Sequence, residues 1–217
     1  MKRKDSNLLS KLNNPEFSHL KWLFAWLGYF ILYFLTERFI PTQRCYTVHC
    51  TLDDKIPFLE IFLLPYVFWY LLIIGSLLYF ARHNPDSFKK LMIYLIVTQI
   101  TATAVYILLP NKQDLRPAIF PRDNLLTKAV AFLYTIDTNT NVCPSLHVGF
   151  SLGIASVWLK EKRAPRWLKI FVIISVILIC MSVIFIKQHS VVDIFAALPM
   201  CFLAEIIAFH LPLRKSA

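Results

Sequence analysis

The residues from Trp167 to Ile186 read WLKIFVIISVILICMSVIFI, and the polar stretch KQHSVVD follows them from Lys187 to Asp193. The first stretch has about the 20 mostly apolar residues that an α-helix needs to cross a bilayer. The second stretch places a histidine and an aspartate four positions apart, directly after the apolar run. We therefore expect a membrane helix that ends at a chemically active site.

The composition of the whole chain also favours a membrane protein. Of its 217 residues, 57% are hydrophobic and 17% are charged, against roughly 45–50% and about 25% in soluble domains. The four glycines form no phosphate-binding loop motif, which argues against a nucleotide-binding fold. The net charge of +10 is spread between apolar runs. It therefore indicates membrane orientation, and we expect no nucleic-acid partner.

Six segments have the length and apolarity of a membrane helix: approximately residues 20–36, 56–81, 91–109, 143–159, 167–186 and 191–211. The fourth is the weakest, because it opens with polar residues. The stretch 124–134 is apolar on one face and too short to span, so it predicts a helix that lies at the interface or packs on the bundle. We expect an all-α, polytopic six-helix bundle that forms a single membrane-embedded domain over residues 1–217.

The distribution of positive charge predicts the orientation of these helices. Alternate connecting segments place 15 of the 23 lysines and arginines on one side, which by the positive-inside rule is cytoplasmic. Both termini, including the segment 1–19, then lie in the cytoplasm, and the long connection 110–142 lies outside. A loop of that length is usually functional. We expect a plasma-membrane protein with its active site on the extracytoplasmic face.

Three polar patches fall on that outer side, at residues 112–117 (KQDLRP), 143–147 (CPSLH) and 187–193 (KQHSVVD). In the third patch, the spacing of four places His189 and Asp193 on one helix face. A carboxylate bonded to one ring nitrogen leaves the other nitrogen as a directed nucleophile. Ionisable residues within membrane helices are also functional by default. The alternative is an exposed aspartate at a helix start beside an incidental histidine.

The other two patches supply an acid and a phosphate-binding set. His147 lies one turn into the fourth segment, where it is the candidate general acid and base. Ser145 is placed to cap that helix and to meet an anion. The cations Arg116, Lys112 and Lys187 are candidate phosphate ligands, and Arg116 is suited to bidentate contact. The alternative for the cations is that they are solvated loop residues.

Together these residues suit phosphoryl transfer through a phosphohistidine. His189 would attack phosphorus, Asp193 would orient it, and His147 would protonate the departing oxygen and then activate water. We expect no metal and no cofactor, because the cations would neutralise the phosphate.

The motifs Pro144-Ser145-x-His147 and His189-x-x-x-Asp193 resemble those of the type 2 phosphatidic acid phosphatase superfamily. The resemblance covers residues 112–193 by motif and nearly the whole chain by topology. It implies six membrane helices, His147 as acid, His189 as nucleophile with Asp193 in support, and Arg116 and Ser145 at the phosphate.

Three positions depart from the family pattern. Leu109 and Val183 stand where the family has a lysine and an arginine, and Leu146 stands in place of a glycine. These departures resemble a branch that also contains inositol phosphorylceramide synthases, so the resemblance implies phosphotransferases as well as phosphatases.

Four functions follow as hypotheses. The first is a lipid phosphatase acting on phosphatidic acid, phosphatidylglycerol phosphate or a polyprenyl diphosphate. The second is a lipid phosphotransferase with an alcohol acceptor. The third is a transporter that uses Glu205 and His210 as relay groups. The fourth is a hydrolase whose metal is held by the two histidines and the aspartate of the outer patches. Pairing of Cys45 with Cys50 and the oligomeric state stay open.

Overall fold

The computed structural model of the chain describes residues 15–39 and 44–210. Most of the predicted cytoplasmic N-terminal segment and the tail cations Arg214 and Lys215 lie outside these residues. The described part of the chain is mostly helical, with 75% of its residues in helices. No disulfide joins Cys45 and Cys50.

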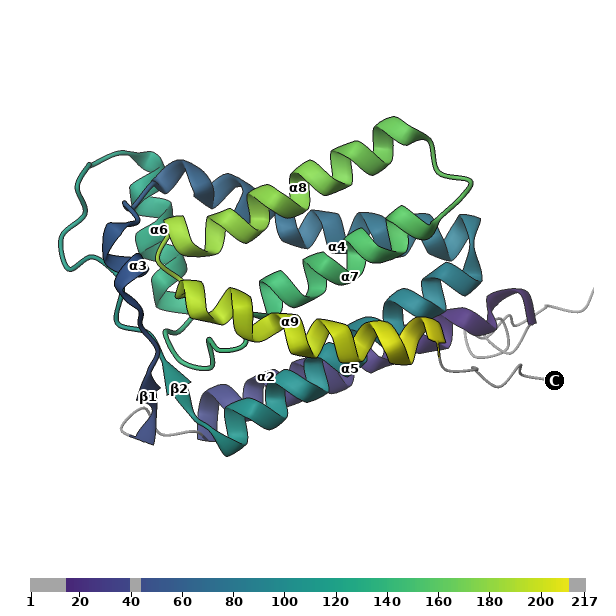
Figure 1. Cartoon of the computed structure of the whole chain (residues 1–217), viewed down its shortest axis with the longest axis horizontal. Helices are drawn as coiled ribbons and strands as arrows, with labels where there is room; N and C mark the ends of the chain where they lie inside the picture. Colours follow the sequence, from purple (N-terminus) through teal and green to yellow (C-terminus); the bar gives the residue numbers. More distant parts are fainter. Residues whose placement is uncertain (1–14, 40–43, 211–217) are drawn as a thin grey trace, which may run out of the picture.

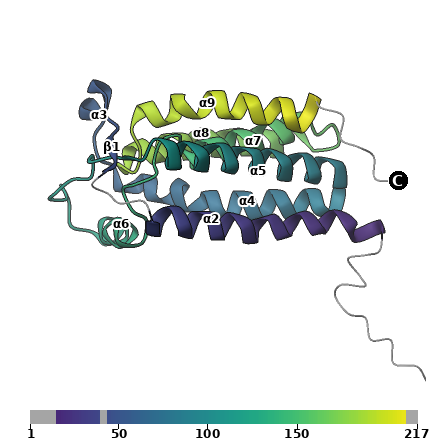
Figure 2. The same ribbon diagram turned by 90° about the horizontal axis from the view of Figure 1, so that it is seen from below.

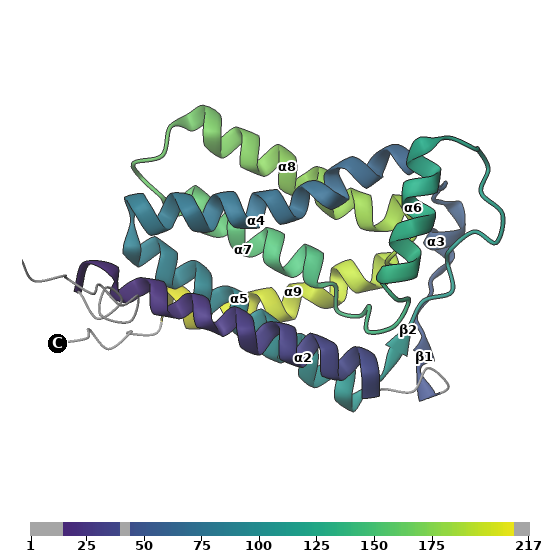
Figure 3. The same cartoon turned by 180° about the vertical axis from the view of Figure 1, so that it is seen from behind.

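The long helices run side by side, and the short elements gather at one end of the bundle (Figures 1 and 3). We call this end, which carries α3, α6 and the two strands, the α6 end. The strands β1 (Tyr46–Thr47) and β2 (Asn111–Lys112) pair in parallel. The helices in chain order are η1 (Pro15–Phe24), α2 (Ala25–Phe39), α3 (Thr51–Lys55), η3 (Glu60–Phe62), α4 (Leu63–His83), α5 (Pro85–Leu108), α6 (Leu125–Ile136), α7 (Leu146–Lys160), α8 (Arg166–Phe185), α9 (Val191–Glu205) and η4 (Ile206–His210).

All six predicted segments contain helix, and four helical runs are long and apolar enough to cross a membrane. These are Glu60–His83, Pro85–Leu108, Arg166–Phe185 and Val191–His210. The helix α7 has 15 residues, below the ~17–25 that a span usually needs. The continuous run of η1 and α2 over residues 15–39 is not among the four. These four helices indicate a membrane protein, while the count of six spans stays a prediction. The short helix expected at 124–134 is α6.

Helix α7 lies in the middle of the bundle and contacts α4, α5, α8 and α9. Its glycines Gly149 and Gly153 are one turn apart and allow α5 to approach closely, as small residues do between membrane helices. A Cβ atom at Gly153 would lie 2.3 Å from the Tyr94 ring. This close contact fixes α7, and hence the residues at its start.

Helix α2 is more peripheral and packs mainly on α5. Figure 2 shows α2 and α4 together on the side of the molecule opposite α9. The space between α2 and α4 leads to the site described next.

Candidate functional site

His189 and Asp193 form a hydrogen-bonded dyad at the start of α9. The Asp193 Oδ2 atom accepts from His189 Nδ1 at 3.0 Å and from the Ser190 backbone N–H at 3.0 Å. Ser190 is the N-cap of α9, so Ser190 and Asp193 make a capping box. Asp193 is fully buried. Because a carboxylate only accepts, the hydrogen lies on Nδ1, and Nε2 of His189 carries the lone pair.

Ser145 connects this dyad to α7. It is the N-cap of α7, and its Oγ atom lies 3.3 Å from His189 Nε2 and accepts from the Val148 backbone N–H at 3.4 Å. The Ser145 backbone N–H donates to the Asp193 carbonyl oxygen at 3.2 Å. The starts of α7 and α9 are therefore bonded to each other, which brings the second and third sequence patches together.

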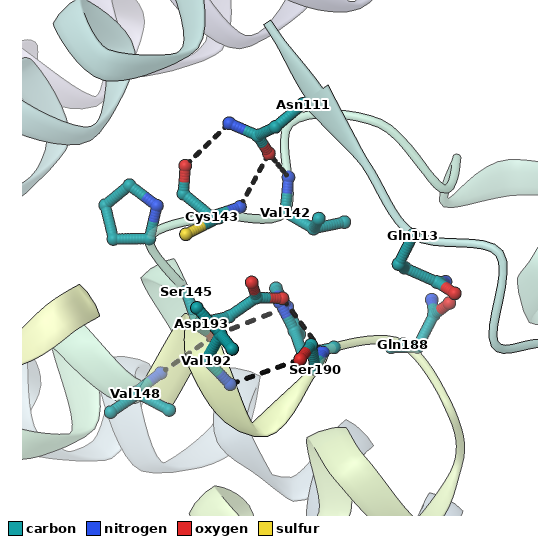
Figure 4. A network of polar contacts seen from close by, with 12 residues as sticks. Asn111, Gln113, Val142, Cys143, Ser145, Val148, Gln188, Ser190, Val192 and Asp193 are labelled. Atoms are coloured by element: carbon teal, nitrogen blue, oxygen red, sulfur yellow. Dashed lines mark hydrogen bonds and ion pairs between the residues drawn. The ribbon is translucent and has the colours of Figure 1, made fainter. Parts of the chain in front are cut away.

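Asn111 holds the chain just before Ser145 in place. Its Oδ1 atom accepts from the backbone N–H groups of Val142 and Cys143, and its Nδ2 atom donates to the Cys143 carbonyl oxygen at 2.8 Å (Figure 4). Sequence reasoning did not single out Asn111. The sequence shows only a polar residue shortly after an apolar helix. Such residues are too common to predict a hydrogen bond with a residue 32 positions away.

His147 lies between two aromatic rings of α4. Its ring centroid is 4.3 Å from that of Tyr66 and 4.2 Å from that of Trp69. The His147 and His189 centroids are 5.9 Å apart. Among the described residues, His147 Nε2 has no hydrogen-bond partner. The nitrogen therefore stays available for a group that a ligand brings.

A cavity of about 520 Å³ opens beside both histidines. Its polar end holds His147, His189, Gln188 and Asp137, and the rest runs between α2 and α4. The residues that these two helices contribute are mainly aromatic and aliphatic: Trp26, Tyr29, Phe30, Tyr33, Tyr66, Trp69, Tyr70, Ile73, Ile74 and Leu77. The cavity thus combines a reactive polar end with a long apolar part, the usual character of a small-molecule site.

Arg116 binds protein oxygens at the end of α6. Its guanidinium donates to the Gln188 Oε1 atom at 2.6 and 3.0 Å and to the backbone carbonyl oxygens of Tyr134, Asp137 and Thr138. It also stacks on the Tyr134 ring at 4.3 Å. Arg116 therefore reaches the site through Gln188, the neighbour of His189, and does not line the cavity.

The two lysines predicted to hold phosphate also point elsewhere. Lys112 pairs with Asp114 at 3.0 Å near the surface. Lys187 donates to the carbonyl oxygens of Asp53 at 2.7 Å and Ile56 at 2.6 Å, and burial lowers its pKa. Its φ of 56° lies in the left-handed region, which is strained for a lysine. The predicted phosphate role of these cations stays a prediction, and the structure gives each of them other partners.

Asp53, on α3, clamps the start of α9 from outside the three sequence patches. Its carboxylate accepts from Ser190 Oγ at 2.6 Å, from the Val191 N–H at 2.8 Å and from the Cys50 N–H at 2.8 Å. Burial acts to raise the pKa of Asp53, but these hydrogen bonds hold it below its usual value. Lys187 also donates to backbone oxygens of α3 and of the residue that follows it. Because both sets of bonds join α3 to residues 187–191, α3 holds the loop that carries His189 in place.

Within residues 15–39 and 44–210, no group of three or more His, Cys, Asp or Glu side chains is arranged to hold a metal ion. His189 and Asp193 bond to each other instead. No family model, no curated protein and no solved structure matches the chain.

Proposed function

We propose that this protein is a membrane lipid phosphatase that cleaves a phosphate monoester or diphosphate through a phosphohistidine at His189. The observation that carries the proposal is the His189 dyad: Nδ1 is fixed by buried Asp193, and the histidine lines a cavity that continues between long apolar helices. The proposal includes six spans, both termini in the cytoplasm of a bacterial-type plasma membrane, and the α6 end on the extracytoplasmic face.

The proposed reaction has two steps. The lone pair of His189 Nε2 forms a bond to phosphorus while the bond from phosphorus to the lipid oxygen breaks, and that oxygen takes a proton from His147. His147 then accepts a proton from water as the water oxygen attacks phosphorus, and the electron pair of the N–P bond returns to His189. The products are phosphate and a lipid alcohol from a monoester, or phosphate and a lipid monophosphate from a diphosphate.

The shape of the cavity supports a lipid as the substrate. Its lining follows α4 from Tyr66 to Leu77, which is about 16 Å along a helix that rises ~1.5 Å per residue. Tyr70, Ile74 and Phe30 line it and are more than half exposed, so the cavity has an open side towards the membrane. Phosphatidic acid, phosphatidylglycerol phosphate and polyprenyl diphosphates all have a phosphate end and a chain that fit this form.

A second candidate is a lipid phosphotransferase, in which an alcohol replaces water. One observation favours it: among the described residues, no lysine or arginine lines the cavity. A phosphomonoester, the substrate of a phosphatase, carries up to two negative charges that cations would have to neutralise. A phosphodiester, from which a transferase can take its headgroup, carries one negative charge and so needs fewer cations.

The test is an assay of purified protein in detergent micelles on phospholipids and polyprenyl phosphates, with and without an alcohol acceptor. Free phosphate and transferred headgroup are both measured. His189→Ala should lose nearly all turnover, while His49→Ala, at an exposed histidine paired with Asp54, should keep it. Normal turnover by a folded His189→Ala protein would overturn the mechanism. An absolute need for the acceptor would identify the transferase.

A further inference from the structure

Asp137 is a charged group at the site that the proposed reaction does not use. It follows α6, and it lines the cavity. Its Oδ2 atom accepts from the Tyr66 hydroxyl at 2.6 Å and from Gln188 Nε2 at 2.8 Å. Tyr66 stacks on His147, and Gln188 precedes His189. The Tyr66 side chain therefore links the Asp137 carboxylate to His147, and the Gln188 side chain links it to the residue next to His189.

The negative charge of Asp137 is not paired with a cation of the described chain. Both groups that donate to its side chain are neutral, and no ion pair in the described part of the chain includes it. Arg116 donates to the backbone oxygen of Asp137 and not to its carboxylate. A doubly charged phosphomonoester bound beside this carboxylate would be repelled, and the repulsion is strong where water is scarce.

Aromatic rings surround the same position. Tyr66 and Tyr70 of α4 and Tyr29 of α2 line the same cavity as Trp69 and Asp137. A carboxylate among aromatic rings is the environment that binds alkylammonium groups, because the ring faces attract a cation.

We propose that Asp137 and these rings form a subsite for the cationic headgroup of a zwitterionic phospholipid. The inference rests on the phosphohistidine chemistry of the proposed function and replaces its monoester or diphosphate substrate with a phosphodiester that bears a substituted ammonium. The phosphate lies at His189, the ammonium at Asp137, and the chains lie between α2 and α4.

This placement also selects the bond that breaks. His147 contacts both Tyr66, the partner of Asp137, and Trp69, one turn further along α4. In the proposed binding mode the glycerol oxygen lies on the Trp69 side of the phosphate, away from Asp137, where His147 can protonate it. The N–P bond to His189 forms as the bond from phosphorus to the glycerol oxygen breaks, and that oxygen takes the proton of His147. The phosphorus keeps its headgroup. Attack by water then releases the phospho-alcohol and restores His189.

The experiment compares lipids with identical acyl chains and four headgroups: phosphate, phosphoglycerol, phosphoethanolamine and phosphocholine. The two ammonium lipids should have the higher kcat/KM by about tenfold or more, the effect of one desolvated cation contact. Asp137→Asn should remove that preference, measured as the ratio of kcat/KM for the phosphocholine lipid to kcat/KM for the phosphoglycerol lipid. Asp123→Asn, at an exposed carboxylate on the other end of α6 paired with Lys128, is the matched control and should keep the preference.

Binding is measured in parallel through the fluorescence of Trp26 and Trp69, which line the cavity. In His189→Ala protein, phosphocholine lipid should bind more tightly than phosphatidic acid, and Asp137→Asn should abolish the difference. An equal loss for all headgroups would show that Asp137 only supports Tyr66 and Gln188, and would overturn the inference. His189-dependent turnover with phosphatidic acid preferred would overturn it too, while leaving the proposed function intact. His189-independent turnover would instead sink the proposed function.

Discussion

His189 owes its orientation to two carboxylates that act on different parts of the same loop. Asp193 bonds the ring, and Asp53 bonds Ser190 and Val191 on either side of the helix start. The bond between His189 and Asp193 is local in sequence, whereas the bond between Asp53 and Ser190 joins residues 137 positions apart. A nucleophile misplaced by about 1 Å can lose roughly 10²-fold in rate, so we assign Asp53 as a positioning residue for the proposed reaction.

We expect Asp53→Asn to lower kcat by about tenfold with little change in KM, because the amide keeps one acceptor but loses the charge. Asp54→Asn is the control, since Asp54 is exposed and pairs with His49. Steady-state kinetics on the preferred lipid separates the two variants. An unchanged kcat for Asp53→Asn, or an equal loss for Asp54→Asn, would contradict the assigned role.

The lowered pKa of Asp53 gives this prediction a pH dependence. A carboxyl whose pKa is lower in the folded state stabilises the fold above its unfolded pKa of about 3.9, and this contribution is lost as pH falls through the folded value. The difference in Tm between wild type and Asp53→Asn should therefore stay constant from about pH 5 to 8 and disappear only in stronger acid. A difference that closed near neutral pH would point to another group.

At the scale of elements, α6 is joined to the site by one arginine. Arg116 caps the C-terminal end of α6 through carbonyl oxygens and reaches Gln188 with the same planar group. Lysine has one point charge and cannot reproduce this fork. The predicted phosphate ligand thus serves, in this structure, as a connection between α6 and the His189 loop.

Arg116→Lys should lower the stability by about 2 kcal/mol, the typical loss of a charged hydrogen bond. Tm and KM are measured together, with Arg166→Lys, at an exposed arginine of α8, as the control. A lowered Tm with an unchanged KM supports the structural connection. A raised KM at unchanged Tm would show that Arg116 holds phosphate directly.

The local parts of the site were predictable from the sequence, and the long-range parts were not. His189 and Asp193 lie four positions apart, and Ser190-Val191-Val192-Asp193 also carries a capping-box pattern that defines the start of α9. Asp53, Asn111 and Asp137 lie in connecting segments without a motif. Their contacts with Ser190, Val142 and Gln188 span 137, 31 and 51 positions respectively. These contacts depend on how the helices assemble, which helical periodicity does not specify.

The same contrast applies to the helices themselves. Hydropathy located all six apolar segments and α6, because each needs only its own residues. It placed the start of the fourth segment at residue 143, three positions before α7 begins at Leu146, since it cannot detect that Ser145 is a cap bonded to α9. The six-span topology stays a prediction beside four helices of sufficient length.

At the scale of the whole molecule, the position of α2 determines how a substrate arrives. The cavity lies between α2 and α4, and α2 packs mainly on α5. We therefore propose that a lipid chain enters from the side, between two helices, while its phosphate stays near the α6 end.

A bulky residue in this passage should block long-chain substrates selectively. Ile74→Trp is expected to lower kcat/KM for a long-chain lipid by about tenfold, because the indole fills space that the chain needs. Hydrolysis of a water-soluble phosphate ester should change little. Leu78→Trp is the control, as Leu78 is similarly exposed at 52%, against 55% for Ile74, but does not line the cavity. Equal effects of the two variants on the lipid would contradict lateral entry.

The open side between α2 and α4 has a consequence for the kinetics. If the substrate arrives through the plane of the bilayer, its effective concentration is its mole fraction in the membrane and not its molarity in the assay. Dilution of the lipid surface with inert detergent, at constant bulk substrate, should then slow turnover. The rate of such an enzyme reports the composition of the membrane around it.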